Sequence, residues 1–448
     1  MSAKEFTVVT QLHYDNNKEI IDYIEEVLSI YSKAKRETFY DYRHDKVNGY
    51  RFSRSSYNTY LQNKYGILKK TANSIIADAM GTYNLLIEQR KYERNQLLIK
   101  IESLEKLISK LELERTLNSK ALNEGSTFLL EAQRNLRKKI VSKKNKFNRY
   151  KQKLKNLNYQ ISTGNVKICF GTKDLLRKDF NAFLAKRDNQ VYYMGDVSEK
   201  GCNRLLQLEY NSKNNQFDIS LRRDFKDYKN VSDDEKYIKG RCYFKYYKKE
   251  ITEILKTHSS PLTYRIIKRN GRYYLHCTFK ITKNEDSILT RSNNGVIGLD
   301  FNKGHIDMTE TNKYGHLVST KFLPYRSRQG TKTQSDLEKI VSLVVKYALE
   351  KGKDISIEDL DFKKSKSKSQ SKQGRKYNNM IHSLAYKKFS SILESSSYRN
   401  NVNLIKVNPA WTSWLGEKLY ASRMKLNAHT SASYVIARRG QGYNDSVV

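Results

Sequence analysis

The spacing of apolar residues changes partway along the chain, and this change constrains the fold more than any other feature. Up to about residue 162, apolar residues recur at intervals of three and four, which is typical of amphipathic helices. Beyond Gly164 they form short alternating runs, which are typical of strands. We therefore expect a multidomain α+β protein with a long helical region followed by regions built on sheets.

One alternating run precedes the helical region. Residues 5–14 alternate apolar and polar positions and are rich in β-branched and aromatic side chains, so they predict a strand. We interpret residues 1–15 as the first strand of a later β-region. The helices of residues 16–162 are then an insertion after this strand.

The helical region contains a heptad pattern. Apolar residues at 97, 101, 104, 108 and 111 are spaced by 4, 3, 4 and 3 residues. After a break at 123–126, a second helical run continues to Ile161. These two runs predict an antiparallel helical hairpin.

The charge of the chain points to a polyanionic partner. The 84 Lys and Arg residues outnumber the 47 Asp and Glu residues, which leaves a net charge of +37. Nucleic acid is the first candidate and a membrane surface a distant second. The chain has no apolar stretch of the length that spans a membrane, and its first residues lack the apolar core of a signal peptide. We therefore expect a cytoplasmic protein.

The second helical run concentrates this positive charge. Residues 134–155 contain eleven cations and no acid, whereas a merely solvated helix face usually mixes both signs because like charges repel. We interpret this run as a surface that binds phosphates. Its cations are Arg134, Arg137, Lys138, Lys139, Lys143, Lys144, Lys146, Arg149, Lys151, Lys153 and Lys155.

Residues 163–290 are predicted to be mostly β. Asn270-Gly271 is a strong signal for a two-residue hairpin turn. The expected strands are Val166–Phe170, Gln190–Met194, Leu205–Tyr210, Phe217–Leu221, Thr263–Lys268 and Tyr273–Ile281. The four cysteines are 33 to 40 residues apart with no Cys-x-x-Cys pair, so we expect buried or half-buried thiols and no zinc.

The third region, residues 291–448, has the order β-β-β-α-β-α-β-α, which predicts an α/β layer. Residues 363–376 interrupt it with a basic, low-complexity sequence that predicts a flexible arm. We expect this basic arm to contact nucleic acid, and a plain flexible linker is the alternative. Its candidate contacts are Lys363, Lys364, Lys366, Lys368, Arg375 and Lys376.

Two acids in this region lie at the ends of apolar strands. Asp300 ends one strand and Glu358 ends another. A buried acid costs free energy unless it is paired or binds a metal, and strands of one sheet bring such ends together. Each acid alone is more simply a strand-end residue, but the two together favour a site for Mg²⁺. Asp307, Asp359 and Asp361 rank lower as ligands.

The sequence around these acids resembles a known family. Gly298-Leu299-Asp300-Phe301-Asn302 and Glu358-Asp359-Leu360 resemble the first two catalytic motifs of RNase-H-like RuvC nuclease domains. The wider chain, from about residue 165 to residue 443, resembles TnpB, the transposon-encoded RNA-guided nucleases related to the ancestors of type V CRISPR effectors. The further matching segments begin at Lys167, Gly374, Val407 and Leu426.

Two departures from the family pattern stand out. Trp414–Lys425 contains no cysteine, so the zinc ribbon of many members is absent. The third catalytic acid of the family aligns with His429, a ligand better suited to Mn²⁺ than to Mg²⁺. His429 is either a third metal ligand or a capping residue, and Asp445 is a further candidate.

The resemblance implies a fold, partners and a reaction. It implies a helical recognition lobe (16–162) inserted in a wedge-like β-barrel (1–15 and 163–290), followed by a RuvC-like nuclease domain (291–448). A monomeric ribonucleoprotein would carry a transposon-end guide RNA and cut double-stranded target DNA beside a short motif, with two Mg²⁺ or Mn²⁺ ions held by Asp300, Glu358 and His429. A nuclease-inactive RNA-guided DNA-binding protein and an RNA-independent nuclease are the alternatives.

Overall fold

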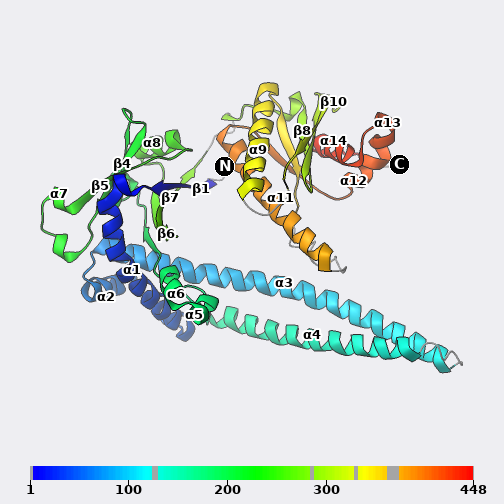
Figure 1. Cartoon of the computed structure of the whole chain (residues 1–448), viewed down its shortest axis with the longest axis horizontal. Coiled ribbons are helices and arrows are strands. Elements are labelled where there is room, and N and C mark those ends of the chain that lie inside the picture. The colour runs from blue at the N-terminus through cyan, green and yellow to red at the C-terminus, as the bar shows by residue number, and fades with distance from the viewer. Residues whose placement is uncertain (1–3, 124–129, 283–286, 327–330, 361–372, 447–448) are drawn as a thin grey trace. The chain divides into compact units, whose positions relative to one another are not determined.

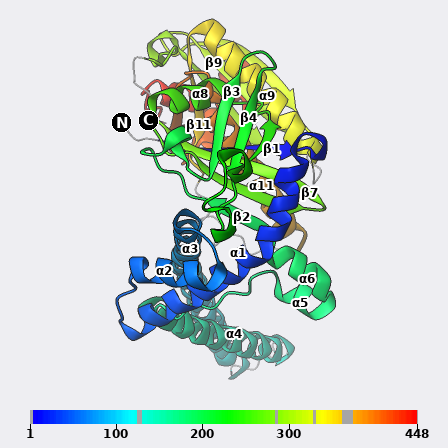
Figure 2. The ribbon, with the colours of Figure 1, turned by 90° about the vertical axis from the view of Figure 1, so that its left-hand side faces the viewer.

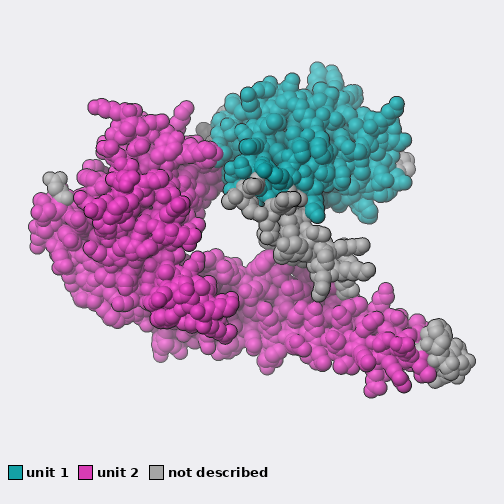
Figure 3. Space-filling model, in the orientation of Figure 1, with its two compact units in different colours: residues 1, 283–448 teal, residues 2–282 magenta. Residues whose placement is uncertain are grey.

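The computed structural model describes residues 4–123, 130–282, 287–326, 331–360 and 373–446. The chain divides into two compact units, residues 2–282 and residues 283–448 (Figure 3). Each unit combines helices with sheet. No helix among the described residues has both the length and the apolar character needed to cross a membrane.

The first unit contains the long helices of the chain. Helices α1, α2 and α3 pack together (Figure 2). Helix α1 ends at Gly49, whose φ of +73° is the left-handed conformation that favours glycine. The helices of this unit are α1 (Tyr14–Asn48), α2 (Arg54–Tyr65), α3 (Lys69–Asn123), α4 (Leu130–Thr163), α5 (Lys173–Lys178), α6 (Phe180–Arg187), α7 (Asp233–Lys236) and α8 (Lys248–Thr257).

Helices α3 and α4 form the antiparallel hairpin that the heptad spacing predicts (Figure 1). Leu97 and Ile101 of α3 are buried in one cluster with Leu157 near the end of α4. Farther along, Lys144 pairs with Glu112 at 2.6 Å. Late residues of one helix therefore meet early residues of the other, which is the signature of antiparallel packing.

The strands of the first unit form two sheets. A four-stranded sheet has the order β1-β7-β6-β2, and a three-stranded sheet has the order β3-β4-β5. Among the described residues no closed barrel is found, so the expected wedge-like barrel is not confirmed. The strands are β1 (Lys4–Leu12), β2 (Gln190–Tyr193), β3 (Leu206–Asn211), β4 (Gln216–Arg222), β5 (Tyr237–Cys242), β6 (Thr263–Arg269) and β7 (Arg272–Ile281).

Strand β1 lies in the same sheet as strands from the end of the unit. It runs antiparallel to β7, with Phe6 opposite Phe279. The helices α1 to α4 therefore occupy the chain between two paired strands. The Asn270-Gly271 turn joins β6 and β7, and both its residues have positive φ, as the hairpin signal predicts.

One predicted strand in this unit is wrong. Val166–Phe170 pairs with no strand among the described residues. Instead, Val166 is fully buried against Phe39, Ala79 and Tyr83 of the helices. An apolar run of this length can fill a gap between helices as well as it can form a strand, and tertiary packing decides between the two. The cysteines match their prediction, since Cys202, Cys242 and Cys277 are buried and Cys169 is half-buried, all as free thiols.

The second unit is built on a mixed five-stranded sheet with the order β10-β9-β8-β11-β12. Strands β8, β9 and β10 are antiparallel neighbours, whereas β11 runs parallel to both β8 and β12. This is the α/β layer that the element order predicts. The elements are β8 (Val296–Asn302), β9 (His305–Thr311), β10 (Leu317–Pro324), α9 (Thr331–Lys351), β11 (Asp354–Glu358), α11 (Gln373–Arg399), β12 (Leu404–Val407), α12 (Thr412–Leu415), η6 (Gly416–Ala421), α13 (Ser422–Met424) and α14 (Ala428–Gly440).

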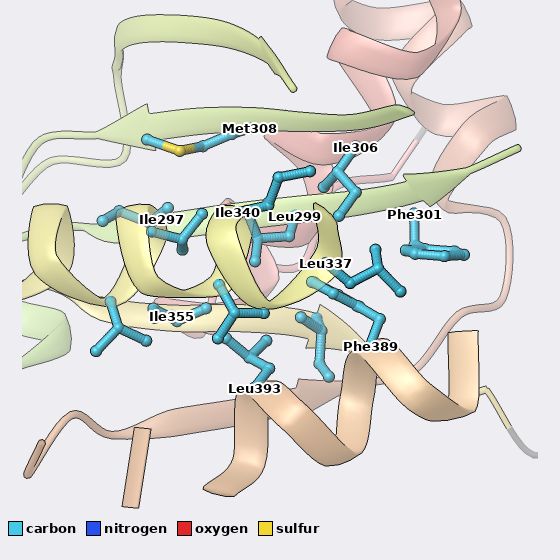
Figure 4. Packing of buried hydrophobic residues seen from close by; sticks show 14 of the residues in the cluster. Ile297, Leu299, Phe301, Ile306, Met308, Leu337, Ile340, Ile355, Phe389 and Leu393 are labelled. Carbon is cyan, nitrogen blue, oxygen red and sulfur yellow. The ribbon is translucent and has the colours of Figure 1, made fainter. Parts of the chain in front are cut away.

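Helices cover both faces of this sheet. On one face, α9 and α11 pack on Ile297, Leu299 and Ile355, as Figure 4 shows. On the other face, α14 crosses β8 so closely that a Cβ at Gly298 would lie 2.2 Å from the Ser433 carbonyl oxygen. Only glycine permits this approach, and it brings the start of α14 to the ends of the strands.

The predicted basic arm falls mostly outside the described residues. Lys363, Lys364, Lys366 and Lys368 lie there, as does Asp361. Arg375 and Lys376 lie in the first turn of α11, because that helix begins at Gln373. Helix α11 therefore begins within the range expected to be a flexible arm.

Candidate active site

The alternation of strand β8 determines where its acid lies. Leu299 and Phe301 point into the apolar core with α9 and α11. Successive residues of a strand point to opposite faces, so Gly298 and Asp300 face α14. In β11, Ser356 also faces α14, since its hydroxyl donates to the Ile436 carbonyl at 3.0 Å. By the same alternation, Glu358 belongs to the face that carries Asp300.

Asp300 stands directly opposite a second acid. The β8–β9 hairpin pairs Asp300 with Asp307, and both are buried, at 8% and 2% exposure. The Asn302 amide donates to Asp300 Oδ2 at 2.8 Å and to Asp307 Oδ2 at 3.4 Å. Asn302 therefore bridges the two carboxylates and offsets part of their repulsion.

Glu358 is held in place by the first residue of α12. The Thr412 hydroxyl donates a hydrogen bond to Glu358 Oε1. On the other side, the Tyr386 hydroxyl donates to the Glu358 backbone carbonyl. Since β11 is a parallel neighbour of β8, with Ile357 opposite Leu299, Glu358 follows its strand at the same edge where Asp300 ends its own.

Both candidate acids have raised pKa values. Burial is the main cause for Asp300, and the neighbouring Asp307 raises its pKa further, against the lowering effects of Asn302 and His429. Burial also raises the pKa of Glu358, and the Asp300 carboxylate adds to this, whereas Thr412 lowers it. Of the two acids, Asp300 therefore contributes to the raised pKa of Glu358, and the register of β8 and β11 is what places them at one edge of the sheet.

His429 lies at the start of α14 beside Asp300. The Asn427 side chain caps this helix, accepting from the backbone N–H of His429 at 3.0 Å and of Thr430 at 2.8 Å. His429 Nδ1 is 3.5 Å from Asp300 Oδ2, and its side chain is 54% exposed. The structure therefore places His429 beside Asp300, and it places Glu358 at the same edge of the sheet as Asp300.

Two further residues lie beside this group. Asp307 ranks lower as a ligand on sequence grounds, and His305 shows no ligand spacing in the sequence. His305 Nε2 lies 3.1 Å from Asp307 Oδ2, and its ring meets that of His429 at 5.3 Å between centroids. Thr430 donates to Asp307 Oδ1 at 3.1 Å. The signal was present, because a two-residue turn at Lys303-Gly304 places position 300 opposite position 307.

The remaining acids lie apart from this group. Asp445 pairs with Arg438 at 2.9 Å, near the far end of α14 from His429, so it is engaged elsewhere. Asp359 is exposed and lines a cavity of about 190 Å³ with Tyr386 and Glu394 of α11. Neither is placed as a partner of Asp300.

The donor set suits a hard divalent cation. Mg²⁺ is usually held by one or two carboxylates together with substrate phosphates, and Asp300 and Glu358 are two such carboxylates. Asn302 donates to Asp300 Oδ2 and Thr412 donates to Glu358 Oε1, so the other oxygen of each carboxylate accepts no hydrogen bond from a described residue. Within the described part of the chain, no group of three or more His, Cys, Asp or Glu side chains is arranged to hold a metal ion.

The cations of α4 are displayed to solvent. Ten of the eleven predicted residues are exposed, and Lys143 is half-buried. Lys144 is paired with Glu112, and no other member of the eleven has an ion pair with a described residue. The buried side of the helix is apolar, with Leu136, Ile140 and Leu157 facing α3. The surface of α4 therefore carries a dense row of uncompensated positive charge.

Comparison with solved structures finds neighbours of two kinds. Thermus thermophilus RuvC, in complex with a Holliday junction substrate, aligns over 32% of this chain and 88% of its own, at 10% identity and a TM-score of 0.24. Cas12i1, in an R-loop complex after target DNA cleavage, aligns over 86% of this chain and 49% of its own, at 11% identity and a TM-score of 0.20. A Cas12i complex with crRNA and double-stranded DNA has 12% identity and a TM-score of 0.19.

These scores are too low to establish a shared fold, and the proposals below rest on the residues of this chain. No protein-family model matches the sequence, and no curated protein matches it.

Proposed function

We propose that this chain is a divalent-metal-dependent nuclease that cuts a phosphodiester at Asp300 and Glu358. The observation that carries the proposal is the convergence of these two acids. They come from strands separated by a helix, they share one face and one edge of the sheet, and burial raises the pKa of both. Burying like charges together destabilises a fold, and such an arrangement is characteristic of functional sites.

The two acids have a common role in this proposal. Asp300 and Glu358 would hold Mg²⁺ or Mn²⁺, which when bound activates water and stabilises the leaving oxygen of the phosphodiester. Asn302 and Thr412 orient the two carboxylates through single hydrogen bonds, which leave their other oxygens free to face a ligand. Hydrogen-bonded partners of this kind fix the geometry of ligating groups.

His429 completes the site as either a third ligand or a proton acceptor. Its Nδ1 faces Asp300, and its exposed position makes the ring accessible to substrate. Asp307 and His305 position these residues through their contacts. Asp307 accepts hydrogen bonds from Asn302 and Thr430, so it positions the residue that holds Asp300 and the helix that carries His429.

We further propose that RNA guides this nuclease, as in the TnpB family. The motifs around the two acids and the exposed cations of α4 support this step, together with a net charge of +37. A guide RNA from the transposon end would lie against α4, and base pairing would select the double-stranded DNA target. The monomeric protein with its RNA would be the active particle.

The test is a purification followed by a cleavage assay. The full chain is expressed with its flanking transposon DNA, and RNA that copurifies is sequenced. The complex is then incubated with plasmids that carry the matching target and a randomised flank, with Mg²⁺, with Mn²⁺ and with EDTA. Cuts that require the metal, the RNA and its matching sequence support the proposal. Absence of cuts with both metals refutes the nuclease.

The assay also separates the alternatives. Copurifying RNA with target binding but no cleavage indicates a nuclease-inactive binding protein, an outcome that the histidine at position 429 keeps open. Cleavage that survives removal of the RNA indicates an RNA-independent nuclease. The RNA-independent result would mean that the α4 surface binds a partner other than a guide RNA.

A further inference from the structure

The segment between β12 and α14 exposes both tryptophans of the chain. Trp411 is 72% exposed and Trp414 is 44% exposed, and the sequence contains no other tryptophan. Tryptophan has the largest aromatic surface of any residue, and leaving it in water forgoes a large hydrophobic gain. Two such side chains together on a surface indicate a binding site.

These tryptophans are tied to the candidate active site. Thr412, the residue after Trp411, donates its hydroxyl to the Glu358 carboxylate. The start of the same segment is fixed at Asn408, whose carbonyl accepts from Arg439 Nη1 at 2.5 Å and whose side chain accepts from the Ala410 N–H at 3.0 Å. Trp411 is therefore held between two anchors, one of which is a proposed metal ligand.

The backbone at Trp411 is strained. Its φ of +65° and ψ of 9° place a bulky residue in the left-handed region, where the Cβ atom comes too close to the backbone. Strain of this kind persists where the surroundings fix the conformation, and it clusters at functional sites. Here it caps the start of α12, where the Leu415 N–H donates to the Trp411 carbonyl at 2.8 Å.

We propose that Trp411 stacks on an unpaired base of the DNA strand that is cut, with Trp414 bordering the same base. The ring centroids of Trp411 and Trp414 are 6.0 Å apart and the ring planes are inclined at 68°. A base that stacks on the face of one indole would therefore meet the other indole at its own edge. This inference rests on the proposed nuclease function, because it places the base beside the phosphate held at Asp300 and Glu358.

Charge favours nucleic acid as the occupant. Arg439 lies close enough to Glu358 to lower its pKa. Among the described residues its guanidinium, which has five N–H donors, has one hydrogen-bond partner, the Asn408 carbonyl. A base stacked on Trp411 would carry its phosphates past this cation. Duplex DNA hides the faces of its bases in the helical stack, so the site requires an unpaired strand.

The first experiment measures tryptophan fluorescence, which reports on this site alone because the chain has no other tryptophan. The full chain is titrated in EDTA with oligothymidylate of about 12 nucleotides, a length that suits one single-strand site. The control is an abasic oligomer of equal length, which has the phosphates without the bases. We expect saturable quenching by oligothymidylate and little change with the abasic oligomer. Equal responses, or none, would overturn the proposal.

The second experiment separates stacking from a structural role of the loop. Trp411→Gly removes the ring but adopts the left-handed conformation without strain, so the variant should melt at the parental temperature or above it. Its affinity for labelled oligothymidylate should fall by between about 5-fold and about 150-fold. Trp411→Phe should restore part of the affinity, and Tyr314→Leu, at a 60%-exposed aromatic beyond the other end of β9, should leave it unchanged.

The outcomes distinguish this inference from the nuclease proposal. Parental affinity of Trp411→Gly for oligothymidylate overturns the inference even if the protein cuts DNA. Loss of that affinity, together with failure of the wild type to cut with any metal, upholds the tryptophan site and refutes the nuclease. If single-stranded RNA quenches and DNA does not, the stacked strand is RNA, and the assignment to the cut DNA strand is refuted.

Discussion

The surface of α4 and the acidic end of the five-stranded sheet carry charge under opposite physical conditions. Ten of the eleven α4 cations are exposed to solvent on the surface of their helix. The free-energy cost of each charge is therefore small, and each can attract a nearby phosphate. Asp300 and Asp307 are buried beside one another, where charge is costly and position is fixed by named hydrogen bonds. The comparison teaches that changes to α4 should act gradually and leave the fold intact, whereas changes at the acids should act abruptly and alter stability.

The largest expected effect is on cleavage when an acid is removed. Asp300→Ala and Glu358→Ala should each lower the rate by about 10³-fold or more, since a metal ligand contributes more than the single hydrogen-bond donors whose loss costs 10²- to 10³-fold. Nucleic-acid binding should stay within about threefold, because such ligands act mainly on the transition state. Single-turnover cleavage and gel-shift titrations measure the two quantities.

The matched control is Asp359→Asn, which removes an exposed carboxylate next to Glu358. This variant should cut at the parental rate, because Asp359 faces the cavity with α11. A wild-type rate for Asp300→Ala, or a loss in Asp359→Asn as large as in Glu358→Ala, would mean that the site has been placed on the wrong residues.

The second-largest expected effect is on nucleic-acid affinity. Lys138, Lys139, Lys153 and Lys155 are exposed and have no ion pair with a described residue. Replacing all four with Gln should weaken RNA binding by roughly 10²-fold at physiological salt and should reduce the salt slope of log affinity by about 3 to 4. The melting temperature should not change, in contrast to the acids. Binding titrations at several salt concentrations test this.

The control changes net charge equally at other places. Lys91, Lys106, Lys236 and Lys346 each pair with an acid of their own helix. Their replacement with Gln should weaken binding much less than replacement of the α4 set. If both variants lose affinity equally, the total charge of the protein matters and α4 is no particular surface.

The same contrast explains how much could be predicted from the sequence. Asp300 and Glu358 were predictable because an acid that ends an apolar strand is a local pattern. The hairpin of α3 and α4 was predictable because heptad spacing is local too. Asp307 ranked low because its importance depends on pairing register, which places it opposite Asp300. His305 had no signal until Asp307 was recognised.

Other features depend on tertiary contacts that local patterns do not encode. Val166 looks like part of a strand, yet it is buried among helices. Asp445 is close in sequence to the final helix, but Arg438 engages it. The strain at Trp411 follows from the anchoring of its loop at both ends, so no composition or spacing could have indicated it.

A smaller effect on cleavage is expected at His429, whose half-exposed side chain is intermediate between the exposed α4 cations and the buried acids. His429→Ala should reduce cleavage by roughly 10- to 100-fold, the range for residues that support a metal site. His429→Asp should retain activity and shift the preference from Mn²⁺ toward Mg²⁺, since it adds a hard oxygen ligand. Cleavage is measured against concentration of each metal.

Asp307→Asn sharpens this test. If Asp307 is the third carboxylate ligand, its variant should change the metal dependence and His429→Asp should not. If Asp307 positions its neighbours, as its contacts with Asn302, Thr430 and His305 indicate, Asp307→Asn should lower the rate with either metal and leave their ratio unchanged. Identical metal curves for wild type, His429→Ala and His429→Asp would remove His429 from the site.

The smallest expected effect is on stability, and it has the opposite direction to the effect on cleavage. Burial raises the pKa of Asp300, so the folded protein holds this proton more tightly than the unfolded chain does. The ionised side chain therefore destabilises the fold above the raised pKa, and this cost disappears as the pH falls below the unfolded value near ~3.9.

Asp300→Asn keeps the shape of the side chain and an oxygen that can accept from Asn302. It should raise the free energy of unfolding at pH 7 by on the order of 1 kcal/mol, a gain typical of substitutions that remove a destabilising functional residue. The advantage over wild type should shrink as the pH is lowered from 7 toward 4, and Asp359→Asn, at an exposed acid, should show neither gain nor pH dependence. Melting temperatures of the three proteins across this pH range provide the measurement. An Asp300→Asn variant that melts below wild type at pH 7 would mean that the buried carboxylate stabilises the fold, and the contrast between costly buried acids and inexpensive surface cations would then fail at its central residue.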